Sequence, residues 1–174
     1  MLRSYDIART HGFHDKELSK EHMLMLVISE IGEAIEADRK GNHADIVAFM
    51  EREHVHPDYR ERFKAYIKDS VEDELSDVCI RLFDLCGTLG VDVEIPSDRD
   101  ANVSSYMSQL SFCERCFYLC RILTNPFDKI GERVGDVLYA ILWMCDDMGI
   151  DIVRHIELKM EYNSGREAKH GKAY

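Results

Sequence analysis

Apolar residues recur three and four positions apart along most of the chain, and this spacing is the strongest constraint on its fold. One such run contains Leu24, Val27 and Ile31, and another extends from Phe63 to Leu89. Because an α-helix turns once in about 3.6 residues, this spacing places the apolar side chains on one face. The chain has only three prolines in 174 residues, so few positions interrupt a helix. The sequence therefore predicts an all-α fold.

Capping residues and helix breakers divide the chain into expected helices. The first helix is expected from Ser19 to Gly41, because a glycine after a basic last turn is typical of a helix end. Residues 58–89 form either one long helix or two that join near Ser70, where Ser70-x-x-Asp73 matches a capping box. Further helices are expected at 103–120, 130–148 and 151–163, and the segment 42–58 is expected to be a connection with a short helix.

Length and charge limit the class of protein. A chain of 174 residues is long enough for one domain with a sizeable core, so we expect a single domain over 1–174. A formal net charge of −11 argues against nucleic acid and anionic membranes as partners. The sequence shows no membrane-spanning run and no secretory leader. Six cysteines without such a leader indicate reduced thiols, and the expected location is the cytoplasm.

The second part of the chain repeats the pattern of the first. The segment "DVCIRLFDLCGTLGVDV" from Asp77 matches "DVLYAILWMCDDMGIDI" from Asp136 in length and apolar pattern. The chain therefore reads as a divergent duplication, with one half at 19–95, a second at 100–163 and a basic tail at 164–174. The alignment of the two halves pairs Glu30 with Glu114, Glu33 with Phe117, Glu74 with Arg133, and Asp77 with Asp136.

The first half carries two acidic pairs that border its apolar stripes. Glu30 and Glu33 are three residues apart, as are Glu74 and Asp77, so each pair lies on one helix face. If the two helices pack antiparallel, four carboxylates converge, which is how helical bundles hold hard divalent cations. Carboxylates about 4 Å apart repel by roughly 4 kcal/mol near a protein surface. We therefore expect Mg²⁺, or Mn²⁺ in its place. The alternative is that these residues only solvate an acidic helix.

Two longer stretches carry a resemblance to a known family. "ISEIGEAIEADRKG", followed by "KDSVEDELSDVCIRLFDLCGTLGVDVE", resembles the MazG-like branch of the all-α nucleotide pyrophosphohydrolases, in which an E-x-x-E helix precedes an E-x-x-D helix. The segment "KMEYNSGREAKHGK" is similar to the closing segment of that family. The resemblance implies that Glu30, Glu33, Glu74 and Asp77 hold the metal, and that Lys159 and Asn163 contact the nucleotide.

The resemblance also implies an activity and an assembly. The expected reaction is hydrolysis of a nucleoside triphosphate to monophosphate and pyrophosphate, with Glu33 as the residue that accepts the proton of the attacking water. Glu36 is the alternative proton acceptor. Subunits of the family pair, so we expect either a homo-oligomer or two halves packed as a pseudo-dimer, with a site assembled from both halves. The alternatives are a dUTP/dCTP-type or phosphoribosyl-ATP-type pyrophosphohydrolase, or a non-catalytic helical interaction module.

Overall fold

The structure is a computed structural model that describes residues 18–93, 95–96 and 106–165. These residues form α-helices and no strand, which confirms the expected all-α fold. Within them, no helix combines the length and the apolarity that crossing a membrane requires. The helices are α2 (Lys20–Lys40), α3 (Ile46–Glu51), α4 (Tyr59–Tyr66), α5 (Val71–Leu89), α7 (Phe112–Leu123), α8 (Ile130–Asp147) and α9 (Ile152–Ser164).

The first helix begins and ends where its caps predict. The Ser19 hydroxyl accepts a hydrogen bond from the His22 backbone N–H, and this contact starts α2. Gly41 ends the helix with a φ of 64°, a left-handed conformation that glycine adopts without a steric penalty. Glu30 and Glu33 therefore lie in the middle of α2, away from both of its capped ends.

The long apolar pattern at 58–89 is two helices, not one. The Ser70 hydroxyl accepts from the Asp73 backbone N–H at 3.2 Å and begins α5. The residue before it, Asp69, has a φ of 61°, which a non-glycine residue adopts only where surrounding contacts hold it. This turn separates α4 from α5 and fixes the position at which the acidic helix begins.

The expected helix over 103–120 is interrupted. Residues 103–105 lie outside the described part, 106 and 107 are helical, and α7 itself starts at Phe112 after a turn at 108–110. Ser111 and Glu114 form a reciprocal capping box there, which satisfies backbone N–H groups that a new helix leaves unpaired. The apolar spacing continued through this turn, and so the sequence pattern concealed the start of the helix.

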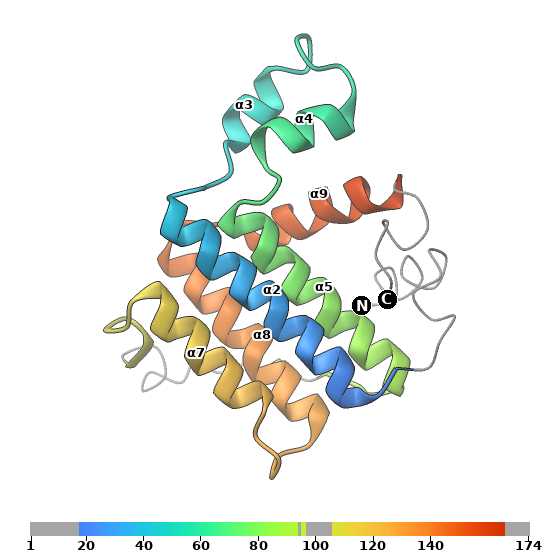
Figure 1. Cartoon of the computed structure of the whole chain (residues 1–174), viewed down its shortest axis with the longest axis vertical. Coiled ribbons are helices and arrows are strands. Elements are labelled where there is room, and N and C mark those ends of the chain that lie inside the picture. Colours follow the sequence, from blue (N-terminus) through green and yellow to red (C-terminus); the bar gives the residue numbers. More distant parts are fainter. Residues whose placement is uncertain (1–17, 94, 97–105, 166–174) are drawn as a thin grey trace.

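Four long helices lie side by side and enclose the main core (Figure 1). α2 packs closely against α5, α7 packs against α8, and the two pairs meet through contacts of α2 with α7 and of α5 with α8. Their shared core contains fully buried Val27, Leu75, Leu82, Leu119 and Ile141. The chain runs in opposite directions along α2 and α5 (Figure 1), so their acidic pairs can face each other.

The remaining helices form a second, smaller core at one end of the molecule. α3 and α4 lie in the connection between α2 and α5, and α9 crosses the end of α5 beneath them (Figure 1). This core consists of Phe49, Phe63, Ile67, Leu158 and Tyr162. The Tyr59 hydroxyl also donates to the Leu158 carbonyl at 2.7 Å. These contacts hold α9 against the first turns of α5, where the acidic residues of that helix begin.

Candidate metal and phosphate site

Three glutamates from two helices converge into one cluster. Carboxylate oxygens of Glu30 and Glu33 on α2 and of Glu74 on α5 lie within 4.8 Å of one another. We call this set the three-glutamate cluster. Carboxylate oxygens are the ligands that Mg²⁺ and Mn²⁺ prefer, and three such groups at this separation can share one ion.

The cluster has a buried side and an exposed side. Glu30 is 3% exposed and Glu74 is 5% exposed, whereas Glu33 faces solvent. The difference arises because Glu30 lies beside the buried stripe of α2, next to fully packed Val27 and Ile31. One edge of the cluster is therefore open to small charged molecules from solution.

Glu74 is a buried acid that lacks a polar partner. Among the described residues, no side chain or backbone group hydrogen-bonds or ion-pairs with its carboxylate. Burial, together with the nearby Asp73 carboxylate, raises the pKa of Glu74 to about 8. The carboxyl group therefore keeps its proton near neutral pH, and a cation that bound there would take the place of that proton.

Glu30 has a partner within the protein. The Arg81 Nε donates to Glu30 Oε1 across the α2–α5 interface. Burial still raises the pKa of Glu30, although the Arg81 guanidinium opposes that shift. The three-glutamate cluster therefore contains one internally neutralised carboxylate and two that are not.

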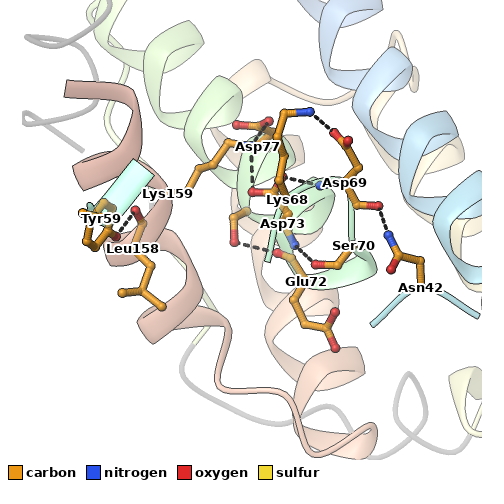
Figure 2. A network of polar contacts seen from close by, with 11 residues as sticks. Asn42, Tyr59, Lys68, Asp69, Ser70, Glu72, Asp73, Asp77, Leu158 and Lys159 are labelled. Atoms are coloured by element: carbon orange, nitrogen blue, oxygen red, sulfur yellow. Dashed lines mark hydrogen bonds and ion pairs between the residues drawn. The ribbon is translucent and has the colours of Figure 1, made fainter. Parts of the chain in front are cut away.

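Lys159 of α9 joins two further carboxylates of α5 (Figure 2). Its Nζ lies 2.7 Å from Asp73 Oδ1 and 2.8 Å from Asp77 Oδ2. Lys159 is 4% exposed. Burial alone would lower the pKa of its ammonium, but Asp77 and Asp73 raise it above the usual range. We call Asp73, Asp77 and Lys159 the lysine network.

Asp77 is thus placed beside the cluster but in contact with Lys159. It lies one helical turn after Glu74, and its charge contributes to the raised pKa values of both Glu30 and Glu74. The three-glutamate cluster itself contains the other three residues that the sequence predicted as metal ligands. The role of Asp77 as a fourth ligand stays a prediction.

Asp73 is a site residue that the sequence analysis missed. It was interpreted only as a helix cap, yet it is 1% exposed and pairs with Lys159. Its second oxygen accepts from the Asp69 backbone N–H at 3.0 Å, which holds the strained turn before α5 (Figure 2). Carboxylate oxygens of Asp69, Asp73 and Glu74 also lie within 4.8 Å of one another. Because acids are common in the first turn of any helix, no sequence signal distinguished Asp73.

Asn163 lies one turn beyond Lys159 on α9. It is buried, and within the described ranges its Oδ1 has no hydrogen-bond partner. Its predicted contact with a nucleotide stays a prediction, as does that of Lys159. The basic residues of the tail after Gly165 lie outside the described residues.

The second half holds no matching carboxylate cluster in the part of the chain that the structure describes. Glu114 caps α7, where it accepts from the Ser111 backbone N–H at 2.8 Å. Phe117 is 66% exposed. Arg133 is buried and donates to the Leu123 carbonyl at 2.9 Å, and Asp136 faces solvent. The two halves therefore differ at positions that form the candidate site.

Comparisons of the chain with models of known protein families, with curated proteins and with solved structures found no match. The resemblance to the MazG-like family accordingly rests on the sequence motifs alone. The fold and the site have to carry any functional conclusion.

Proposed function

We propose that the protein is a divalent-metal-dependent nucleotide pyrophosphohydrolase, which converts a nucleoside triphosphate to the monophosphate and pyrophosphate. The observation that carries this proposal is Glu74, a buried carboxylate that faces Glu30 and Glu33 and has no polar partner among the described residues. The resemblance to the MazG-like family supplies the reaction class.

The donor set fits a hard divalent ion. The cluster offers carboxylate oxygens only, with no sulfur or imidazole ligand, which favours Mg²⁺ or Mn²⁺ over zinc. Glu30, Glu33 and Glu74 would hold the ion, and Asp77 would reach it from one turn further along α5. When bound, the ion supplies Lewis-acid polarisation of the phosphate and neutralises charge on the pyrophosphate that leaves.

Side chains of the protein would accept the proton of the water and bind the phosphate. Glu33 is the exposed member of the cluster, so it can accept a proton from a water that enters from solution. The water oxygen forms a bond to the α-phosphorus while the bond to the bridging oxygen of the β-phosphate breaks, and pyrophosphate departs. Lys159 uses two of its three N–H donors on Asp73 and Asp77, which leaves one for a phosphate oxygen.

A panel of nucleoside triphosphates with Mg²⁺ or Mn²⁺ tests the proposal. It should include dUTP, dCTP and phosphoribosyl-ATP, and pyrophosphate and orthophosphate should be assayed separately. Release of pyrophosphate with monophosphate is the expected result. Stepwise release of orthophosphate would contradict the assigned bond cleavage. A panel without turnover would favour the non-catalytic helical module.

A further inference from the structure

Arg81 is placed to interact with more than one anion. Its Nε contacts Glu30, and the side chain is 26% exposed. In the part of the chain that the structure describes, its two terminal nitrogens have neither a hydrogen-bond nor an ion-pair partner. A guanidinium presents a planar fork of five N–H donors that matches carboxylate and phosphate geometry. Most of those donors are available while one holds Glu30.

The position of Arg81 on α5 points it at the same region as the acidic residues. Glu74, Asp77 and Arg81 follow one another at spacings of three and four residues, which keeps them on one face of the helix. Among the described basic residues, Arg81 is the one that pairs with the three-glutamate cluster. It therefore occupies the same carboxylate that a divalent ion would need.

The second half of the chain shows what happens at the aligned position when the carboxylates are missing. The alignment that pairs Glu74 with Arg133 and Asp77 with Asp136 also pairs Arg81 with Ala140, which is buried in the main core. The arginine is thus present where the cluster is present and missing where the cluster is missing. A cation that served only the helix packing would have no reason to follow the cluster.

We propose that Arg81 is a positioning residue that couples metal binding to phosphate binding. Its guanidinium neutralises Glu30 when the cluster holds no metal ion, and it contacts the triphosphate chain when the ion takes over Glu30. The contact of Arg81 with the triphosphate chain rests on the proposed function, whereas its competition with a metal ion for Glu30 does not. Metal alone should consequently bind weakly, and metal together with a phosphate chain should bind much more tightly.

Binding of Mn²⁺ alone tests whether Arg81 competes with the metal ion for Glu30. Free Mn²⁺ is measured by electron paramagnetic resonance during titration of wild type, Arg81→Gln and Arg81→Lys at low ionic strength. Arg81→Gln should bind Mn²⁺ about tenfold more tightly than wild type, because the competing internal cation is gone. Arg81→Lys keeps a cation at the site and should stay within about threefold of wild type. Equal or weaker Mn²⁺ binding by Arg81→Gln would overturn the proposal.

Binding of a phosphate chain tests whether Arg81 contacts the triphosphate. The probe is inorganic tripolyphosphate, titrated by calorimetry in saturating Mg²⁺, so that base preference has no influence. Arg81→Gln should bind it about tenfold more weakly than wild type. Arg81→Lys should fall between the two, because an ammonium lacks the planar fork. Unchanged affinity in Arg81→Gln would show that the arginine is only a counter-ion and would overturn the coupling.

A matched control separates these effects from a general loss of positive charge. Arg154→Gln removes an exposed arginine of α9 that pairs with Glu157, and it should change neither titration. A circular dichroism melt of each variant checks that the fold is retained. If wild type hydrolyses no triphosphate but Arg81→Gln still binds Mn²⁺ more tightly, the proposed function fails while the competition for Glu30 stands. The reverse pattern, turnover without any Arg81 effect on Mn²⁺, removes this inference alone.

Discussion

The α2–α5 pair and the α7–α8 pair contain similar apolar cores but opposite buried charges. Glu30, Asp73 and Glu74 are buried in the first pair, and Arg115 and Arg133 are buried in the second. The two buried arginines each donate to a backbone carbonyl, that of Leu110 and that of Leu123 respectively. Of the buried acids, Glu30 and Asp73 pair with Arg81 and Lys159, and buried Glu72 accepts from the Ala44 backbone N–H. Glu74 has no hydrogen-bond or ion-pair partner among the described residues and lies beside Glu30 and Glu33.

This difference shows which half requires something from outside. Arg115 pairs with Asp147 at 2.7 Å, so its charge is balanced within the second pair. Arg133 donates to the Leu123 carbonyl, although its buried Nε has no partner among the described residues. Carboxylates cannot donate to each other when ionised. Within the described residues Arg81 pairs with Glu30, and Lys159 pairs with Asp73 and Asp77. The first pair is therefore left with excess negative charge in a partly buried position. The site is identified by this imbalance rather than by the count of acidic residues.

The largest expected effect is the loss of Lys159, the buried cation of α9 that pairs with α5. Lys159→Met leaves buried Asp73 beside partly exposed Asp77 without a counter-charge, so the free energy of unfolding should fall by about 3–5 kcal/mol. Arg133→Met in the second pair leaves only the Leu123 carbonyl unpaired and should cost about 1–3 kcal/mol. Urea unfolding of both variants measures the difference.

A second substitution determines whether unpaired charge is the cause. Asp77→Asn in the Lys159→Met background removes one of the two stranded carboxylates and should recover part of the lost free energy of unfolding. If Lys159→Met and Arg133→Met cost the same, or if Asp77→Asn gives no recovery, the charge contrast between the helix pairs is wrong.

Substitutions at aligned positions of the two halves should also differ in their effect on activity, and this difference corresponds to a somewhat smaller free energy than the loss of stability above. Glu30→Gln removes a predicted metal ligand and should reduce pyrophosphate release by on the order of 100-fold. Glu114→Gln, at the aligned position, should stay within about twofold, because glutamine can still accept the capping hydrogen bond from Ser111. The measurement is the rate of pyrophosphate release at saturating Mg²⁺. Similar losses in both variants would show that the second half is not inert.

The stability of the first pair in chelator should depend on pH through Glu74. Its pKa rises from 4.5 to about 8 on folding, so the folded state loses stability relative to the unfolded state as pH increases between these values. Glu74→Gln lacks this loss. In EDTA above pH 8, the free energy of unfolding of the variant should exceed that of wild type by about 1–3 kcal/mol. The difference should vanish below pH 4.5.

Glu132→Gln is the control for this pH dependence. Glu132 lies in the first turn of α8, is exposed and pairs only loosely with Lys129 at 3.5 Å. Its substitution should change the free energy of unfolding by less than about 0.5 kcal/mol at any pH. A Glu74→Gln variant that is less stable than wild type at high pH would mean that the Glu74 carboxylate has a cationic partner in the folded protein.

The fold was largely predictable because local signals agreed. Ser19, Gly41 and Ser70 stand at helix boundaries in the structure as their residue types predict. The start of α7 was not predictable, because apolar residues continue at helical spacing through the turn before it, where Ser111 and Glu114 form the capping box. Periodicity reports which residues share a face, but it contains no information on a break that preserves the spacing.

The acidic residues of the candidate site were predictable, but their counter-charges were not. The three-residue spacings of Glu30 with Glu33 and of Glu74 with Asp77 put each pair on one helix face, and the structure brings Glu30, Glu33 and Glu74 together. The partners Arg81 and Lys159 act over separations of 51 and 86 residues. Such pairings depend on how helices pack, and a single sequence does not specify that packing. The contact of Asp77 with Lys159 could not be predicted for the same reason.

The smallest expected effect concerns the exposed member of the three-glutamate cluster. Glu33→Gln removes one charge from the cluster, but solvent already screens Glu33, so its melting temperature in chelator should lie at or above that of wild type by no more than about 2 °C. Added Mg²⁺ should raise the melting temperature of wild type through binding to the folded state, and should raise that of the variant much less. Differential scanning calorimetry with EDTA and with millimolar Mg²⁺ measures both responses. Glu36→Gln, three residues further along the exposed side of α2 and paired with Arg39 and Lys40, should keep the full wild-type response. If Glu33→Gln responds to Mg²⁺ as strongly as Glu36→Gln does, Glu33 is not a ligand, and the ion must then be held by the buried carboxylates Glu30 and Glu74 without it.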